Sequence, residues 1–442
     1  MRPRMDYAES GEAASMPEMQ VRELGSTKVV RAAKETEVDA MLSVELCAGA
    51  GGLALATTQA GFAPLALLES DPVACETITE NRNRGPRCVK AWPSVEPIDV
   101  HEFDYSSISD PIDLLSGGPP CQPFSLGGKL LGIEDNRDLF AEVARAMRCL
   151  RPRAILIENT KGLSYERFER QLKYILLQLT FPEACRDHKE NWQSFMARLE
   201  RQVTRGKTTE LRYSISCIVL NAADYGVPQN RERLIIVGFR GGEHSPFAYP
   251  APTHSLDRLL HDQWITGEYW DRHKVTSRRR PRPPQKYKGR IRSLKDSPDL
   301  GKALPWRTVR DAIATLPHPR VKNDQFNHEL WVGARSYEGH TGSFYDLPAK
   351  VLKAGRHGVP GGENMLRHPN GAVRYFTIRE CARLQTFPDN YFFSGDWTNT
   401  TRQVGNAVPV LMCRRVAETV RDHLARIDRA GSEHPPGRKV AG

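Results

Sequence analysis

The chain has 442 residues and a formal net charge of +10 at pH 7. This length favours two or three domains, each with a buried core of its own. Its nine cysteines include no Cys-x-x-Cys pair and no Cys/His zinc spacing, so neither a metal site nor a disulfide framework is indicated. We find no signal peptide and no apolar run of membrane-spanning length, and we expect a soluble cytoplasmic protein without a membrane partner.

Strands and helices alternate through the first half of the chain. Before them, residues 1–40 carry scattered charge and no sustained period, so we expect a disordered leader there. Strands are predicted at 42–46, 64–68, 112–115, 154–157, 215–220 and 234–238, and helices at 53–60 and 73–81. Strands separated by helical patterns are typical of βαβ units. The pattern predicts an α/β fold, in which a doubly wound, Rossmann-like sheet occupies residues 41–243.

A glycine-rich turn follows the first predicted strand. It reads Leu46-Cys47-Ala48-Gly49-Ala50-Gly51-Gly52. Such glycines let a ligand approach the backbone and let the next helix begin close to the strand. Glu69 ends the second strand, where a carboxylate can accept hydrogen bonds from both ribose hydroxyls. Asp99 follows a third short segment, and it either accepts from an adenine amino group or is a simple turn residue.

A second turn, after the strand at 112–115, places one thiol between glycines and prolines. It reads Gly117-Gly118-Pro119-Pro120-Cys121-Gln122-Pro123-Phe124-Ser125. Open α/β sheets carry out their chemistry beyond the carboxyl ends of strands, and Gly-Pro pairs form stiff turns. We therefore interpret Cys121 as a nucleophile rather than a packing residue. The glycines of the loop 125–136 favour a segment that closes over a substrate, and the alternative is an ordinary surface loop.

Three further polar motifs accompany these turns. They read Glu158-Asn159-Thr160, Gln229-Asn230-Arg231-Glu232-Arg233 and Gln403-Val404-Gly405-Asn406-Ala407-Val408-Pro409. Glu158 ends the strand at 154–157. We expect Arg231 and Arg233 to point to opposite faces of the strand that follows them. Asn406 is expected in a turn. The plain alternatives are a strand-end cap for Glu158, a surface position for either arginine and a turn asparagine for Asn406.

Residues 181–211 form an insertion that the sheet pattern does not need. Its apolar residues recur at helical spacing, which predicts an amphipathic surface helix packed on the domain; they are Trp192, Phe195, Met196, Leu199 and Val203. A docking role for DNA or for a partner has no support in the sequence.

The pattern becomes irregular after about residue 243. We expect a second, smaller irregular domain over 244–374, followed by a segment at 375–428 that returns to the first domain, and a disordered tail at 429–442. Helices are predicted at 377–384, with Thr377 and Glu380 as a capping box, and at 409–427.

Positive charge is concentrated in this second domain. Residues 270–322 hold sixteen Lys and Arg against four Asp and Glu. A charge run is often only a solvated face. Beside nucleotide-type motifs, a surface that binds phosphates is the better interpretation, because Lys and Arg release counterions from nucleic acid.

The five motifs, in this order, resemble those of the DNA (cytosine-5)-methyltransferases. The resemblance covers residues 41–428 apart from the 181–211 insertion. It implies an enzyme that transfers a methyl group from S-adenosylmethionine to C5 of a flipped-out cytosine in a specific duplex DNA sequence, through a covalent bond between Cys121 and C6. The region 244–374 would then be the target-recognition domain.

The resemblance also implies roles for single residues. Glu158 would protonate N3, since a carboxyl group in a dry pocket keeps its proton more readily. Arg233 would contact the cytosine O2 and Glu158, while Arg231 would serve DNA or structure near the base. The implied cofactor-binding residues are Cys47, Ala48, Gly49, Gly51, Gly52, Leu53, Glu69, Ser70, Asp99, Val100, Pro120, Asn406 and Ala407. The chain departs from the family at Cys47, where an aromatic residue usually packs against the adenine.

Other functions fit the motifs less well. The transfer-RNA branch of the family shares them but generally lacks a large basic recognition region. A catalytically silent DNA-binding protein would be expected to lose Cys121 or Glu158, and a nicotinamide oxidoreductase has no use for the Cys121 loop. The architecture implies a bacterial, nucleoid-associated monomer of a restriction–modification or phage-defence system, with double-stranded DNA and a cognate restriction or defence component as partners and no metal.

Overall fold

The computed structural model describes residues 40–120, 139–205, 211–241, 247–296, 300–321, 324–338, 341–354 and 364–433. Cys121, the loop 125–136 and the expected leader lie outside these residues, apart from Ala40. The same holds for residues 434–442 of the expected tail.

Six strands of the described chain form one mixed sheet in the order β2-β1-β3-β4-β6-β5. They are β1 Met41–Leu46, β2 Phe62–Leu68, β3 Leu114–Gly117, β4 Ala154–Thr160, β5 Tyr213–Asn221 and β6 Glu232–Arg240. Strands β1 to β4 run parallel, and β6 runs antiparallel to both of its neighbours. Every predicted strand of this region is present, and the α/β expectation is confirmed.

The order of the strands reverses at β1. The chain passes from β1 to β2 on one side and then crosses to β3 on the other, so that the ends of β1 and β3 meet. Gly117 pairs with Leu46 there, and a Cβ atom on Gly117 would lie 2.8 Å from the Leu46 carbonyl oxygen. Ligands bind at such a reversal in open α/β sheets, just outside the carboxyl ends of the strands.

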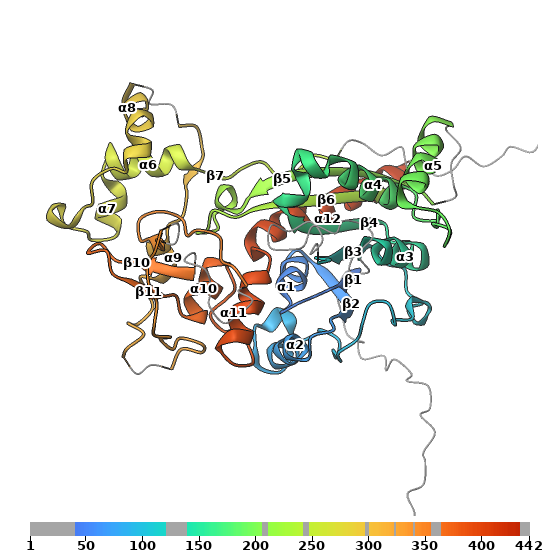
Figure 1. The fold of residues 1–442 in the computed structure, drawn as a ribbon, viewed down its shortest axis with the longest axis horizontal. Helices are drawn as coiled ribbons and strands as arrows, with labels where there is room; N and C mark the ends of the chain where they lie inside the picture. Colours follow the sequence, from blue (N-terminus) through green and yellow to red (C-terminus); the bar gives the residue numbers. More distant parts are fainter. Residues whose placement is uncertain are drawn as a thin grey trace, which may run out of the picture. The chain divides into compact units, whose positions relative to one another are not determined.

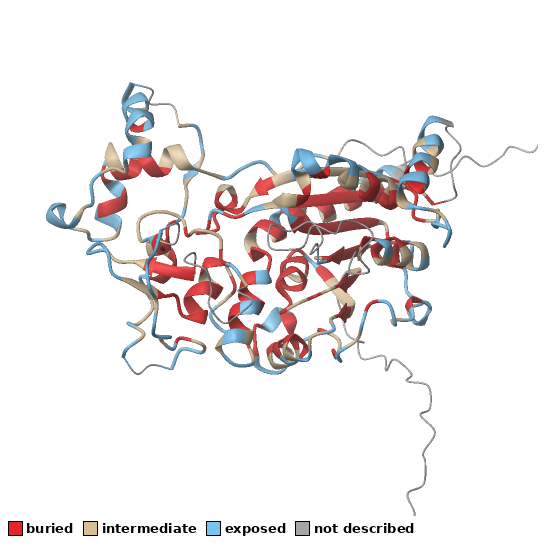
Figure 2. Ribbon diagram, viewed as in Figure 1, coloured by how far each residue is buried: buried red, intermediate tan, exposed pale blue. Residues whose placement is uncertain are grey.

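Helices cover both faces of this sheet (Figure 1). Helices α1 Gly52–Gln59, α2 Pro72–Arg84 and α12 Val410–Glu433 contribute to one apolar core, and α3 Phe140–Leu150, α4 Glu169–Thr180 and α5 Trp192–Arg205 contribute to the other. In Figure 2 the central strands β1, β3, β4 and β6 are largely buried, whereas the edge strands β2 and β5 are mostly of intermediate burial. Burial on both faces explains why the central strands are mostly apolar.

Helix α5 is the surface helix expected within the insertion. Phe195, Met196 and Leu199 are buried in the core that α4 shares. Val203 was placed on the same apolar face, and this assignment is wrong, since 47% of its surface is exposed. It lies near the end of α5, where the helix extends beyond the surface it covers.

The region after β6 is more regular than its sequence indicated. It contains α6 Leu256–Trp264, α7 Glu268–Arg272, α8 Lys288–Asp296 and α9 Val309–Ile313, with the short strands β7 His254–Ser255, β8 Leu304–Pro305, β9 Ser343–Phe344, β10 Met365–Arg367 and β11 Val373–Tyr375. The sequence indicated an irregular domain, and short helices and strands occur within it. These helices are short and bury only a few side chains each, so they leave little hydrophobic period in the sequence.

The C-terminal segment packs against the first helix layer, where α12 lies on α1. Helix α10 Ile378–Leu384 begins at Thr377, and the predicted capping box with Glu380 is confirmed. Helix α11 Trp397–Asn406 was not expected. Helix α12 continues to Glu433, past the predicted end at 427, so residues 429–433 are helical rather than part of a disordered tail. Apolar residues do not recur at helical spacing in the final turns, because the helix extends beyond the hydrophobic core there.

Candidate active site

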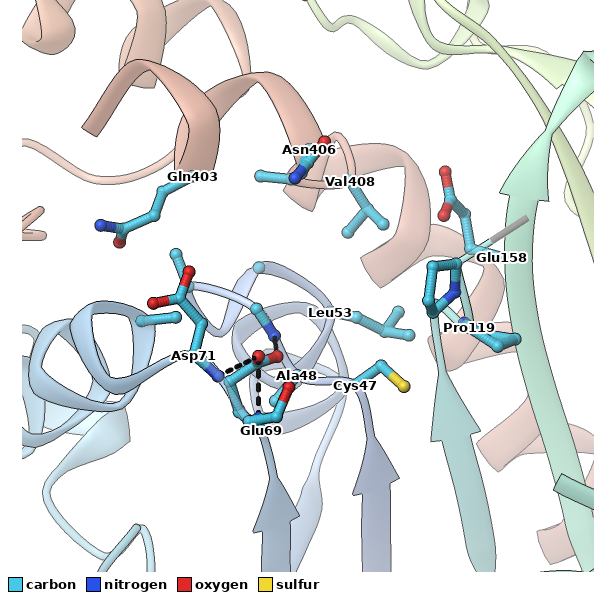
Figure 3. A pocket seen from close by; sticks show the side chains of 18 of the residues that line it. Cys47, Ala48, Leu53, Glu69, Asp71, Pro119, Glu158, Gln403, Asn406 and Val408 are labelled. Carbon is cyan, nitrogen blue, oxygen red and sulfur yellow. Dashed lines mark hydrogen bonds between the residues drawn. The ribbon is translucent and has the colours of Figure 1, made fainter. Parts of the chain in front are cut away.

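A cavity of about 650 Å³ opens at the carboxyl edge of the sheet. Its walls come from the turns after β1, β2 and β3, from the end of β4, from the beginning of β6 and from the end of α11 (Figure 3). Ligand sites of small molecules commonly have this size. The cavity therefore lies at the strand reversal, where the order of the sheet predicts a ligand site.

The glycine turn after β1 forms the floor of this cavity. Gly49 has φ +55°, and a Cβ atom there would meet nothing within 4 Å, so its backbone faces open space. Gly51 has φ +75° but does not line the cavity. A Cβ atom on Gly51 would lie 2.7 Å from the Tyr391 hydroxyl oxygen, and that hydroxyl donates to the Ala50 carbonyl at 2.6 Å. Gly51 thus serves packing, which its sequence position did not reveal.

Glu69 stands directly after β2 at the rim of the turn. Its Oε2 accepts from the Gly49 backbone N–H at 2.7 Å, and its Oε1 accepts from the N–H groups of Ser70 and Asp71 at 2.9 and 2.8 Å. These bonds hold the carboxylate in one orientation, and of its roughly four lone-pair sites they leave one open, on Oε2. The site therefore presents a fixed acceptor to the cavity (Figure 3).

Asp99 and Val100 line the same cavity. The Oδ1 atom of Asp99 accepts from the His101 backbone at 2.9 Å and lies 2.6 Å from His101 Nδ1. These hydrogen bonds lower the pKa of Asp99 below its ordinary value. Asp99 is thus a turn residue that also presents an acceptor to the cavity. The structure agrees with both interpretations of its sequence position.

The Cys47 side chain points toward the Pro119 side of the cavity (Figure 3). Its φ of 53° is left-handed, as the tight turn requires. Burial raises the pKa of the thiol to about 12, and the negative charges of Glu69, Asp99 and Glu45 act in the same direction. Cys47 therefore remains a neutral thiol at ordinary pH and acts as a small apolar wall.

A carboxylate–guanidinium pair lies at the other end of the cavity. Arg233 Nε is 2.7 Å from Glu158 Oε1, and both side chains are almost fully buried. Strands β4 and β6 bring them together, since Thr160 pairs with Arg233. Burial lowers the pKa of Arg233, and the charge of Glu158 opposes this effect. Cys413 of α12 lies near the pair, and burial raises the pKa of its thiol well above the ordinary value.

Arg231 also borders this cavity but is tied to the backbone around it. Its guanidinium donates to the carbonyls of Leu352, Gly405 and Ala407 at 2.8, 2.9 and 3.0 Å. The expectation that Arg231 and Arg233 point to opposite faces is wrong, because both line one cavity. Residues two apart in an extended chain share a face, and an arginine bonded to three carbonyls holds the surrounding segments together.

Asn406 is the last residue of α11 rather than part of an isolated turn, and with Ala407 it lines the cavity. The neighbouring Gly405 admits no side chain, since a Cβ atom would lie 2.4 Å from the Ala354 backbone nitrogen. This close approach fixes the end of α11 against residues 353–354. Helix α11 was missed because polar residues fill it and the motif at its end was interpreted as a turn.

Several cavity contacts were not foreseen. Asn159 Nδ2 donates to the Pro119 carbonyl at 3.1 Å and so supports the chain just before Cys121. On the opposite wall, Gln403 accepts from the Thr77 hydroxyl at 2.6 Å, and Arg402 pairs with Asp71. The predicted residues Ala48, Gly52, Leu53, Ser70 and Pro120 also line the cavity. The motifs contained Asn159 and Gln403, but their roles depend on partners distant in sequence.

Within the described ranges, no group of three or more His, Cys, Asp or Glu side chains is arranged to hold a metal ion. No described helix is both long enough and apolar enough to cross a membrane.

Comparisons with known proteins identify the family. The family model of the C-5 cytosine-specific DNA methylases matches residues 41–181 and 190–422. The type II methyltransferase M.PspPI of Psychrobacter sp. is 32% identical over 85% of this chain and 78% of its own length. M.Eco47II of Escherichia coli is 32% identical over 87% of this chain and 80% of its own length.

A solved structure shares the fold. The S. pombe Dnmt2 methyltransferase superimposes with a TM-score of 0.51 at 17% identity, covering 87% of this chain and 99% of its own. The resemblance carried by the five motifs is confirmed, and the chain belongs to the C-5 cytosine-specific DNA methylase family, as an enzyme of the DNA (cytosine-5)-methyltransferase class.

Proposed function

We propose that this chain methylates C5 of a flipped-out cytosine in a specific duplex DNA sequence, with S-adenosylmethionine as methyl donor and a covalent Cys121–C6 intermediate. The supporting observation is that the glycine turn with Glu69 and the Glu158–Arg233 pair open into one cavity. The root of the Cys121 loop, at Pro119 and Pro120, lines the same cavity. A cofactor end and a base end within one cavity are what a group transfer between two bound molecules requires.

The residues at the cofactor end fit a nucleoside with a sulfonium side chain. The fixed Glu69 carboxylate can accept from a ribose hydroxyl, and the ionised Asp99 can accept from an adenine amino group. The open backbone at Gly49 leaves room for the ligand. When bound, S-adenosylmethionine supplies an electrophilic methyl group. We assign the binding to the cavity-lining residues of the turns after β1, β2 and β3 and of α11, with Gly51 acting through packing.

At the base end, Cys121 would act as nucleophile. After the thiol has lost its proton to water, the sulfur forms a bond to C6 and the electron pair of the C5–C6 double bond moves into the C4–C5 bond. The C4–N3 pair moves onto N3, which takes a proton from Glu158. C5 thereby becomes nucleophilic enough to accept a methyl group. Loss of the C5 proton to a base lets the sulfur leave, and the N3 proton returns to Glu158. Arg233 would hold Glu158 and donate to O2, while Arg231 would keep the surrounding backbone in place.

The substrate follows from this chemistry. A paired base hides C6 within the stack, so the target cytosine must leave the duplex. The region 244–374 would recognise the surrounding sequence, with 41–243 and 375–428 forming the catalytic domain. Because the similar proteins are named type II methyltransferases, we place the chain in a bacterial restriction–modification or phage-defence system. It would act as a cytoplasmic monomer.

The decisive experiment traps the intermediate. A duplex that carries 5-fluorocytosine at the target should form a stable adduct with the wild-type protein, since the C5 fluorine cannot leave as a proton does. Cys121→Ser should form no adduct and transfer no methyl group while still binding cofactor. Methyl transfer by Cys121→Ser would refute the mechanism. Transfer to transfer RNA but not to duplex DNA would favour the other branch of the family.

A further inference from the structure

Residues 256–303 form a small module with a core of its own. The chain enters it through β7 and leaves through β8, and these strands pair in parallel, with His254 beside Leu304. Helices α6 and α7 pack around Leu259, Tyr269 and Trp270, a cluster separate from the two cores of the sheet. In Figure 1, α6, α7 and α8 lie together, apart from the helices that flank the sheet.

Half of the acidic residues of this module form ion pairs with its own arginines. The module has thirteen Lys and Arg and six Asp and Glu. Three of its carboxylates form internal ion pairs, which are Asp257 with Arg290, Asp262 with Arg258 at 2.9 Å and Asp271 with Arg280 at 2.7 Å. These pairs tie α6 to α8 and α7 to the segment after it. Neutralising either partner of such a pair would change the fold as well as the charge.

The remaining basic side chains are exposed. Nine of them have no carboxylate partner among the described residues, and they are Lys274, Arg278, Arg279, Arg282, Lys286, Lys288, Arg292, Lys295 and Lys302. They lie on the chain between α7 and α8, on α8 itself and just after it, and within α8 only Ile291 is buried. A helix and a stiff chain carrying so many uncompensated cations attract a polyanion.

The module is held to the rest of the protein by polar contacts away from the cavity. Gln263 Nε2 donates to the Asp346 carbonyl at 2.6 Å, and the Tyr269 hydroxyl donates to the Asp346 carboxylate at 2.9 Å. His273 lies 2.9 Å from Asp311 on α9. None of the described residues of the module lines the cavity. Its basic surface is thus anchored in place but separate from the chemistry.

We propose that this module binds the sugar–phosphate backbone of duplex DNA beside the target site, adding affinity without selecting the sequence. The inference rests on the proposed function, because it takes duplex DNA as the substrate. Long cationic side chains gain affinity by releasing counterions from phosphates, whatever the base sequence. Phosphate contacts position a protein on the duplex, and base-edge contacts specify the site. Site selection is accordingly assigned to the rest of 244–374.

The test compares two sets of charge changes. Arg278→Gln, Arg279→Gln and Arg282→Gln together remove three exposed charges from the module. Arg186→Gln, Lys189→Gln and Arg201→Gln remove three exposed charges beside α5. Fluorescence anisotropy gives the affinity for a labelled duplex across a range of salt concentrations. The slope of log K against log salt should fall by up to about 2.7 for the module variant, at about 0.9 per lost phosphate contact, and should not change for the control.

A second variant removes the whole module. Because β7 and β8 lie side by side, a short Gly-Ser linker can replace residues 256–303. Bisulfite sequencing should find the same methylated sequence for this variant as for the wild type. Fluorescence anisotropy should show that the variant binds DNA with lower affinity. A wild-type salt slope in the triple variant would overturn the proposal, and so would a changed methylation site in either variant. Failure of the proposed function would give a different result, because the wild-type protein itself would then transfer no methyl group to DNA.

Discussion

The Glu45 carboxyl group is buried within the sheet, and its ionisation is expected to make the stability of the protein depend on pH. Glu45 lies on β1 and is 2% exposed. The Ser116 hydroxyl on β3 donates to its Oε2 at 2.9 Å. Burial raises the pKa of Glu45 to about 8, and the hydrogen bonds from Ser116 and from the Ala54 backbone only partly oppose this. A buried carboxylate with so few donors is poorly stabilised.

The sign of the effect follows from where the proton is held. In the unfolded chain Glu45 titrates near the ordinary pKa of 4.5, whereas in the folded protein it titrates near 8. Between these pH values only the folded state keeps the proton, so the free energy of unfolding falls as pH rises. At about 1.4 kcal/mol per pKa unit, the loss across this window is up to about 5 kcal/mol. Above pH 8 both states are ionised and the loss is complete.

Glu45→Gln removes this titration while keeping an oxygen acceptor for Ser116. The free energy of unfolding of the variant, relative to the wild type, should therefore increase by several kcal/mol from pH 5 to pH 8. Urea denaturation followed by circular dichroism at each pH measures it. The exposed Glu102 supplies the control, since Glu102→Gln should leave the pH dependence unchanged. Parallel curves for Glu45→Gln and the wild type would refute the reasoning.

Five further substitutions test the residues in and beside the cavity. Glu158→Gln should lower the single-turnover methylation rate by about 10²–10⁴-fold while DNA affinity changes little, because glutamine cannot protonate N3; a loss below tenfold would assign the proton to another donor. Arg231→Met should destabilise the protein by about 3 kcal/mol or more, since three buried carbonyls lose their donor. Arg233→Met should lower the methylation rate strongly but the free energy of unfolding only slightly. If urea denaturation showed that Arg233→Met and Arg231→Met lower the free energy of unfolding equally, this division of roles would be wrong. Gly51→Ala should lower the melting temperature, because the left-handed backbone and the Tyr391 hydroxyl both oppose a side chain. Gly49→Ala should lower the melting temperature less, because only its left-handed backbone opposes a side chain, and it should also weaken binding of S-adenosylmethionine, which calorimetric titration measures.

The sequence alone determined the class of fold, the order of the motifs and the position of the glycine turn. Buried parallel strands need continuous apolar runs, so their positions can be read directly from the chain. Glu69 could be placed by its distance from Gly49, since both belong to one βαβ unit. The capping box at Thr377 was likewise local, and it appears as expected. Such features depend on neighbours in sequence.

The roles of residues that depend on partners distant in the sequence were decided only by the tertiary structure. Arg231 and Arg233 belong to one motif, yet Arg231 reaches carbonyls more than 120 positions away while Arg233 meets Glu158. Gly51 resembles a ligand-binding glycine, but the Tyr391 hydroxyl occupies the space beside it. The module at 256–303 was hidden because a core of few side chains leaves almost no period. A residue's type limits the chemistry it can perform, and the side chains that folding brings against it decide which of those roles it takes.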